Sequence, residues 1–245
     1  MAISTALAAA AVALQVVYPL SHGVLRDRLT IAVVVGFSSA VMCHAWEQVG
    51  AGRALAVLGA TAGPGLAAEI VGVHTGYPFG TYHYLHTLGP EVTGVPLLVG
   101  LAWTMLAWPA ALVARRLART FVPRVVWGAA GLATWDLFLD PQMVAAGHWQ
   151  WYSTSPHLPG VPEVPLTNFA GWLIVATAIS LLMQALLAGQ HGIDDRTVVG
   201  LYLWTYFSSV AALGLFLGLA AAAAWGGLGM GLVALPALTS RSIGP

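Results

Sequence analysis

Long apolar stretches alternate with short polar connections along most of the 245-residue chain. About 20 apolar residues in a helix cross the hydrocarbon core of a bilayer. Windows of this length predict membrane-spanning helices over 2–20, 29–49, 54–75, 94–114, 122–146 and 167–188. The last apolar run, 197–238, is about twice as long as one crossing. It most simply forms two helices that turn near the glycines of 226–231, and the alternative is one long tilted helix with a re-entrant tail.

We therefore expect an all-α fold, a polytopic integral membrane bundle of seven to eight transmembrane helices in a single domain over 1–245. Composition supports this class of protein, because 58% of the residues are hydrophobic and only 7% are charged. A soluble domain carries roughly a quarter charged residues. Nine arginines balance nine acidic residues, and this balance gives no indication of a nucleic-acid partner. The expected surroundings are the lipid bilayer.

The distribution of arginines predicts which ends of the helices lie together. The connection between the fourth and fifth predicted helices carries a basic cluster, which the positive-inside rule places in the cytoplasm. With eight spans, Arg53 and Arg241 fall on that side and Arg26 and Arg28 on the opposite side. The connections at 76–93 and 147–166 should then emerge together on the non-cytoplasmic face. The cluster consists of Arg115, Arg116, Arg119 and Arg124.

Three acidic residues lie inside apolar segments, where an ionisable side chain usually has a function. Asp136 and Asp140 are four residues apart, so a helix presents both carboxyl groups on one face. Two like charges at this separation in an apolar medium are costly, and one carboxyl group should keep its proton. Pro141 should bend the helix beside them. Glu69 lies at a similar predicted depth on the third helix, with His74 five residues later.

Several other polar groups have simpler interpretations. His44 and Glu47, one turn apart, fit a structural polar pair. Asn168 at the start of the sixth helix could cap it or hydrogen-bond into a site, and capping is the more conservative interpretation. Asp194 and Asp195 beside Arg196 fit a solvated loop.

Some classes of site lack their characteristic residues. The chain has no lysine for a retinal Schiff base. It has no glycine-rich nucleotide fingerprint after a strand, and its single cysteine, Cys43, is expected to pack as a small hydrophobe. The histidines are not clustered as a membrane di-iron site would require, and His83 with His86 is only a weak signal. We expect neither a metal nor another cofactor.

The polar and aromatic motifs resemble those of a known family. Segment 76–84 reads Gly-Tyr-Pro-Phe-Gly-Thr-Tyr-His-Tyr, and segment 135–143 reads Trp-Asp-Leu-Phe-Leu-Asp-Pro-Gln-Met. Together with Gly-His-Trp-Gln-Trp over 147–151 and Asn-Phe-Ala-Gly-Trp over 168–172, they resemble CruF-type carotenoid biosynthesis proteins. That family includes carotenoid 1,2-hydratases and bisanhydrobacterioruberin hydratases. The motif-bearing core is 69–172, and Glu163 departs from the pattern expected there.

The resemblance implies a cofactor-independent enzyme that adds water across a terminal ψ-end double bond of an acyclic or C50 carotenoid. The expected acid/base pair is Asp136 and Asp140, with Glu69 as the supporting carboxylate. The expected location is a prokaryotic cell membrane, and other carotenoid-pathway enzymes could be partners. Expected contacts to the lipophilic carotenoid come from His74, Tyr77, Phe79, Tyr82, Tyr84, Trp135, Trp149, Trp151 and Asn168.

Other functions remain open at this stage. A cyclase or isomerase of the same family would share the protonation step, and the mass of the product would distinguish it from a hydratase. Prenyl transfer is less attractive, because it would need a richer acidic Mg²⁺ motif than Asp194 and Asp195 provide. A different class is a carotenoid-binding or proton-coupled transport protein that uses the buried acids as a relay.

Overall fold

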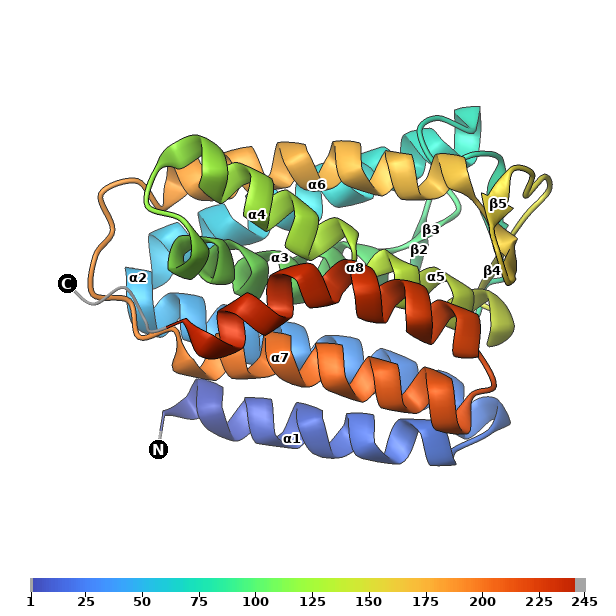
Figure 1. Cartoon of the computed structure of the whole chain (residues 1–245), viewed down its shortest axis with the longest axis horizontal. Coiled ribbons are helices and arrows are strands. Elements are labelled where there is room, and N and C mark those ends of the chain that lie inside the picture. The colour runs from blue at the N-terminus through green and yellow to red at the C-terminus, as the bar shows by residue number, and fades with distance from the viewer. Residues whose placement is uncertain (1, 241–245) are drawn as a thin grey trace.

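The predicted apolar stretches form helices in the computed structural model, which describes residues 2–240 (Figure 1). In this range six helices are long and apolar enough to cross a membrane, so the chain is a multi-pass helical membrane protein. The helical elements are α1 (Ile3–Val17), the 3₁₀ turn η1 (Tyr18–Leu20), α2 (Gly23–Thr75), α3 (Leu97–Leu117), α4 (Phe121–Ala133), α5 (Asp136–Ala145), α6 (Leu166–Leu186), α7 (Arg196–Ala211), the π-helical turn η2 (Ala212–Phe216) and α8 (Ala220–Thr239).

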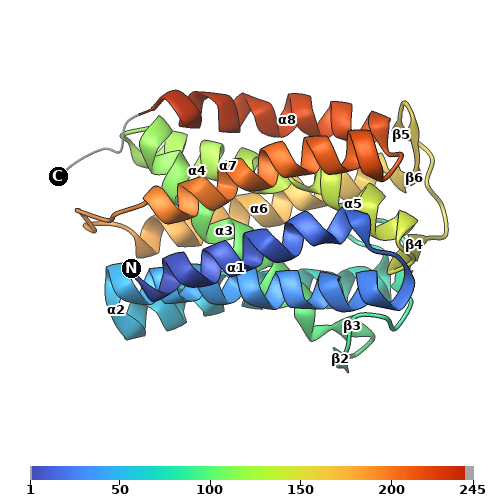
Figure 2. The same ribbon diagram turned by 90° about the horizontal axis from the view of Figure 1, so that it is seen from below.

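Helix α2 contains the two predicted spans 29–49 and 54–75, joined at a sharp break. Gly50 has φ 80° and ψ 165°, a conformation that interrupts the helix and that glycine adopts without steric cost. The chain reverses its direction at this break, because Thr30 in the first half and Glu69 in the second half line the same cavity. Helix α1 packs along the first half, as Figure 2 shows. The break therefore brings Glu69 back to the end of the bundle where the helix began.

The predicted span 122–146 is two short helices rather than one. Helix α4 ends at Ala133 and α5 begins at Asp136, so the interruption lies just before the first acidic residue. Pro141 lies inside α5, which continues past it to Ala145.

The two C-terminal helices are confirmed, but the predicted position of their turn is wrong. The turn lies at Gly218, which has a φ of +72°, whereas the glycines of 226–231 are inside α8. Several of these glycines allow close packing instead. A Cβ atom on Gly226 would come within 2.5 Å of the Phe138 ring, and one on Gly229 within 2.6 Å of Leu137. The glycine-rich face of α8 thus fits against α5.

Short strands gather at one end of the bundle (Figure 1). They form three two-stranded antiparallel sheets, β1 with β4, β2 with β3 and β5 with β6. The pairing of β1 with β4 joins the connections after α2 and after α5, which confirms that these two connections emerge on the same face. The strands are β1 (Tyr82–Tyr84), β2 (Glu91–Val92), β3 (Val95–Pro96), β4 (Trp149–Trp151), β5 (His157–Leu158) and β6 (Val161–Pro165).

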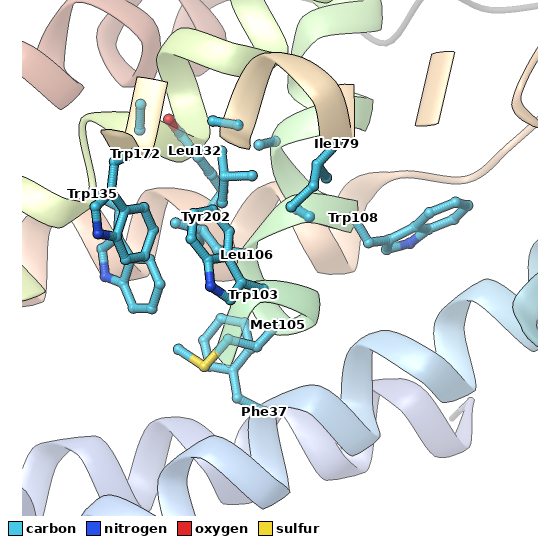
Figure 3. Packing of buried hydrophobic residues seen from close by; sticks show 14 of the residues in the cluster. Phe37, Trp103, Met105, Leu106, Trp108, Leu132, Trp135, Trp172, Ile179 and Tyr202 are labelled. Atoms are coloured by element: carbon cyan, nitrogen blue, oxygen red, sulfur yellow. The ribbon is translucent and has the colours of Figure 1, made fainter. Parts of the chain in front are cut away.

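Helix α3 lies at the centre of the bundle and is buried along most of its length. It reads as apolar on all sides, which is typical of a helix surrounded by other helices. Trp103, Leu106 and Trp108 point from α3 into the core, with Phe37 of α2 and Tyr202 of α7 around them (Figure 3). The central helix therefore supplies a packing surface for α2, which carries Glu69, whereas α5 with the two aspartates packs mainly against α8.

The end opposite the strands carries the arginine cluster, and one prediction there is wrong. Asp195 is not solvated, because its carboxylate is buried and forms two hydrogen bonds with the guanidinium of Arg116. A carboxylate is removed from water here only because a fixed cation pairs with it. Asp194 does lie in an exposed ion pair with Arg196. Arg241 lies outside the described residues, and the cytoplasmic location of this end stays a prediction.

His44 and Glu47 serve separate structural contacts rather than pairing with each other. His44 Nε2 donates to the Asp194 carbonyl oxygen at 2.8 Å, and its Nδ1 accepts from Trp108 Nε1 at 3.1 Å. The Glu47 carboxylate accepts from the backbone and hydroxyl of Ser4. Each side chain therefore ties α2 to a different element at the arginine end.

The strand pairing can be tested by cross-linking. His83 and Gln150 are directly paired, and paired antiparallel residues have Cα atoms about 4.5–5.5 Å apart, which a disulfide can span. We expect a His83→Cys/Gln150→Cys variant to form an intramolecular disulfide on mild oxidation, measured by mass spectrometry after proteolysis. A His83→Cys/Arg119→Cys variant, with its cysteines at opposite ends of the bundle, is the matched control. Equal cross-linking in both variants would contradict the pairing.

Candidate active site

An apolar cavity of about 380 Å³ opens inside the strand-bearing end of the bundle. This volume is in the range of small-molecule binding sites. Residues of α1, α2, α3, α5, α6 and α7 line it, and most of them are hydrophobic or aromatic. Polar groups converge at one place on its wall, where Glu69, Asp140 and Asn168 meet. The cavity therefore combines an apolar interior with a small polar cluster, as a site for a lipophilic ligand would.

Asp136 and Asp140 are bridged by a single amide. Asn168 Nδ2 donates to Asp136 Oδ2 at 2.7 Å and also to Asp140 Oδ2. Trp149 Nε1 donates to Asp140 Oδ1 at 3.1 Å. Asp136 and Asn168 are buried, with exposed fractions of 0% and 1%, and Asp140 is 3% exposed. The helical spacing therefore does place both carboxyl groups on one face, and the bridge comes from a different helix.

The favoured interpretation of Asn168 as a helix cap is wrong. Asn168 is the third residue of α6, and no side chain caps the start of this helix. Its amide group points at the two aspartates instead. The strand β6 leads directly into α6 and positions this first turn over α5.

The bridge carries an electrostatic consequence. Two carboxylates sharing one neutral donor in an apolar environment repel each other strongly. Among residues 2–240, no ion pair involves Asp136, Asp140 or Glu69. Asp136 Oδ1 is buried and has no hydrogen-bond partner in this part of the chain. We infer that the aspartate pair holds a proton, which would relieve the repulsion.

Glu69 sits beside the pair and is held by two tyrosines. The hydroxyl groups of Tyr82 and Tyr84 both donate to Glu69 Oε2, the second at 2.9 Å. Gly72, one turn along α2, makes this approach possible, because a Cβ atom there would lie 3.0 Å from the Tyr82 hydroxyl oxygen. The two hydroxyl groups thereby orient the Glu69 carboxyl group in the wall of the cavity.

Three tryptophans, which Figure 3 shows within the buried core, form an aromatic wall of the cavity. Trp103 and Trp172 stack, with ring centroids 3.9 Å apart and an interplanar angle of 21°. Trp135 meets Trp172 edge-to-face at 6.0 Å. All three line the cavity. Aromatic faces at this position can stabilise a positive charge that develops near the acidic residues.

The structure separates the predicted aromatic contacts into two groups. Tyr84, Trp135, Trp149 and Trp151 line the cavity, and Trp151 Nε1 also donates to the Phe79 carbonyl oxygen at 2.9 Å. Tyr82 does not line the cavity, but its hydroxyl group donates a hydrogen bond to Glu69, which does.

The remaining predicted residues do not line the cavity. Phe79 is buried, but its ring packs against the Tyr82 ring, with ring centroids 6.2 Å apart, and does not line the cavity. Tyr77 is 66% exposed. His74 is also exposed, and its Nδ1 atom bonds to the Ile70 carbonyl oxygen. Tyr77 and His74 follow Glu69 closely in sequence, but they point away from the bundle interior.

Trp103 and Trp172 were not among the predicted site residues. Trp172 had a usable signal, because it follows Asn168 by four residues and so shares its helix face. Trp103 lies in a uniformly apolar helix, where nothing in its neighbourhood distinguishes a site residue from a core residue. Only the packing of α3 against α6 brings it to the cavity.

Fold and site together define a class of protein, a multi-pass helical membrane protein with a buried carboxyl cluster in the wall of an apolar cavity. Residues 29–236 match the carotenoid biosynthesis protein family, and the chain belongs to this family. The match extends well beyond the motif-bearing core 69–172.

A stretch of 122 residues is 36% identical to a bisanhydrobacterioruberin hydratase of Haloarcula japonica. The aligned region covers 47% of this chain and 40% of that relative, so the chain spans less than half of its length. No solved structure matches the chain.

The amide bridge predicts opposite effects of two substitutions on stability. Asn168→Ala leaves buried carboxyl oxygens without a donor, at a cost of about 1–3 kcal/mol or more, so we expect a lower melting temperature. Asp136→Asn preserves the shape and removes one of two competing acidic groups, so we expect an unchanged or higher melting temperature. Thermal unfolding of both purified variants in one detergent measures this. A melting temperature of Asn168→Ala equal to that of the wild type would contradict the bridge.

Proposed function

We propose that the protein is a carotenoid hydratase of a prokaryotic cell membrane, which adds water across a terminal ψ-end double bond of an acyclic or C50 carotenoid. The observation that carries this proposal is the position of Asp140, which lines an apolar cavity together with Asn168, while the Asn168 amide also donates to the buried Asp136. Membership of the carotenoid biosynthesis family supports a carotenoid as the substrate. The hydratase name of the similar protein supports the reaction type.

Protonation of the double bond is the first step of the proposed reaction. The aspartate pair supplies the proton, and Asp140 delivers it because its carboxyl group is the one that lines the cavity. A new C–H bond forms at the less substituted carbon, and the tertiary carbon is left with a positive charge. The proton that leaves converts the pair to two carboxylates. Their mutual repulsion favours the singly protonated pair, so a proton is held beside the cavity and is available when the double bond arrives.

The carbocation then needs stabilisation without premature loss of a proton. The wall formed by Trp103, Trp135 and Trp172 offers aromatic faces and edges but no strong base. A desolvated cation–π contact is worth about 2 kcal/mol or more. The two carboxylates of the deprotonated pair lie near the same space, with Asp140 in its lining, and add electrostatic stabilisation.

Attack by water completes the reaction. Its oxygen forms the C–O bond with the tertiary carbon, and one of its protons passes to a carboxylate. Glu69, which accepts hydrogen bonds from Tyr82 and Tyr84, takes this proton and passes it to the aspartate pair, which closes the cycle. The sum is one water added per double bond, with every carboxyl group returned to its starting state.

Substrate access follows from the shape of the cavity. Its wall continues from the acidic cluster to Gln15 and Val16 of α1 and to Trp204 and Ala211 of α7. An end group that reaches Asp140 would leave the rest of the polyene along these two apolar helices. This arrangement suits a substrate that is dissolved in the bilayer.

The acid/base assignment is tested by converting single carboxyl groups to amides. We expect Asp140→Asn and Asp136→Asn each to lower hydration by about 10²–10⁴-fold, the usual contribution of a general acid, while the protein still accumulates. The measurement is co-expression in bacteria that make lycopene or a C50 precursor, with pigments identified by chromatography and a mass gain of one water. Asp194→Asn, the same change at the opposite end of the bundle, should keep full activity. Hydration retained in both aspartate variants would defeat the assignment.

The aromatic wall is tested at Trp135. Replacement by leucine removes the aromatic ring while keeping an apolar side chain, and losing about 2 kcal/mol of cation–π stabilisation should lower the rate about 30-fold. Replacement by phenylalanine should restore most of the rate. Trp108, in the core away from the cavity, is the control position for the same two changes. A leucine variant as active as the phenylalanine variant would show that the ring is not needed.

A further inference from the structure

A second hollow, of about 140 Å³, is lined by residues at the arginine end of the bundle. In Figure 1 this is the end opposite the strands. It is enclosed by the end of α3, the start of α4 and the loop between α6 and α7. Arg115, Arg116 and Arg124 line it together with the loop residues 189–193 and Asp195. We call this hollow the arginine pocket. The proposed hydration reaction makes no use of it.

The charges around the arginine pocket do not balance. Asp195 is its one acidic lining residue and is already paired with Arg116. In the described part of the chain, neither Arg115 nor Arg124 forms an ion pair. Two positive charges therefore face the same small hollow, and no carboxylate of residues 2–240 pairs with either of them.

Backbone carbonyls hold the two arginines but do not neutralise them. Arg115 donates from Nη1 to the Leu187 carbonyl oxygen at 3.0 Å and from Nη2 to the Gln190 carbonyl oxygen at 2.6 Å. Arg124 donates from Nε to the Ala118 carbonyl oxygen at 3.1 Å, and its Nη atoms make no hydrogen bond to residues 2–240. These bonds fix both guanidinium groups at the rim of the hollow. Donors of Arg124 stay available for an acceptor that is not part of the described protein.

The loop that closes the arginine pocket leaves room for a ligand. Gly189 and Gly192 both have a φ of +70°, and a Cβ atom on either would meet no other atom within 4 Å. A loop without side chains at these two positions lets an anion approach the backbone closely. A planar guanidinium group donates two parallel hydrogen bonds to two oxygens of one phosphate group. A backbone carbonyl group has a single oxygen and cannot accept both bonds in this way.

We propose that the arginine pocket binds a phosphate group that carries at least one negative charge. The site lies where α3, α4 and α6 reach the end of the apolar bundle, at the level expected for lipid headgroups. The phosphate could belong to an anionic phospholipid or be free in solution, and the same guanidinium donors would bind either one. Bound phosphate would neutralise the repulsion between Arg115 and Arg124 and so stabilise the junction of α3, α4 and the loop between α6 and α7.

The experiment compares two sources of phosphate on the purified full-length protein. Thermal unfolding is measured in phosphatidylcholine nanodiscs, with and without added phosphatidylglycerol, and separately with inorganic phosphate against chloride at equal ionic strength. The test variant is Arg124→Gln. The matched control is Arg119→Gln, which removes the same charge from an exposed residue outside the arginine pocket. Arg124→Lys keeps the charge without the planar donors, and it serves as the test variant if the glutamine variant does not fold.

We expect a higher melting temperature with phosphate in the wild type and in Arg119→Gln, and a loss of this shift in Arg124→Gln. The lost charge-assisted hydrogen bonds should weaken the apparent affinity of Arg124→Gln about ten- to hundredfold. A shift with phosphatidylglycerol alone identifies a lipid headgroup, and a shift with inorganic phosphate identifies free phosphate. An equal shift in Arg124→Gln and wild type, an equal loss in Arg119→Gln, or no shift with either source overturns the proposal. This readout does not measure carotenoid hydration. The phosphate proposal can therefore fail while the proposed hydratase function holds, and the reverse.

Discussion

Two acidic groups inside an apolar bundle share one amide donor, and much of the surrounding structure follows from this constraint. Asp136 and Asp140 are removed from water, where an unpaired carboxylate is expensive. Asn168 and Trp149 supply donors from α6 and β4, so these two elements must pack against α5. The position of the strand-bearing loops over the end of the bundle is therefore coupled to the stability of the acidic pair.

The antiparallel pairing of β1 with β4 brings residues from distant parts of the chain together at the site. In each strand the outer residues are buried and the middle one is more exposed, as the alternation of side chains along a strand requires. Tyr82 and Tyr84 thereby face Glu69, while Trp149 on the paired strand faces Asp140. One local backbone pairing orients donors for carboxyl groups on two different helices.

The two ends of the molecule have opposite electrostatic character. Acidic groups gather in the cavity at the strand-bearing end, and uncompensated arginines gather at the other. Between them lies the apolar core around α3, which keeps the two sets of charges apart. Because of this separation, the acidic cluster has no basic ion-pair partner among residues 2–240, and neither Arg115 nor Arg124 has an acidic one there.

The sequence by itself determined the class of fold, the positions of most helices and the shared face of Asp136 and Asp140, because apolar length and helical spacing are local properties. Its motifs also indicated the family, which the match over 29–236 confirms. Only the tertiary structure decided that Asn168 bridges the pair, that Trp103 lines the cavity and that His74 does not. The reversal at Gly50 and the turn at Gly218 likewise depend on backbone angles. Such contacts join residues far apart in the chain, and their geometry is set by how helices pack rather than by the spacing of residues within one helix.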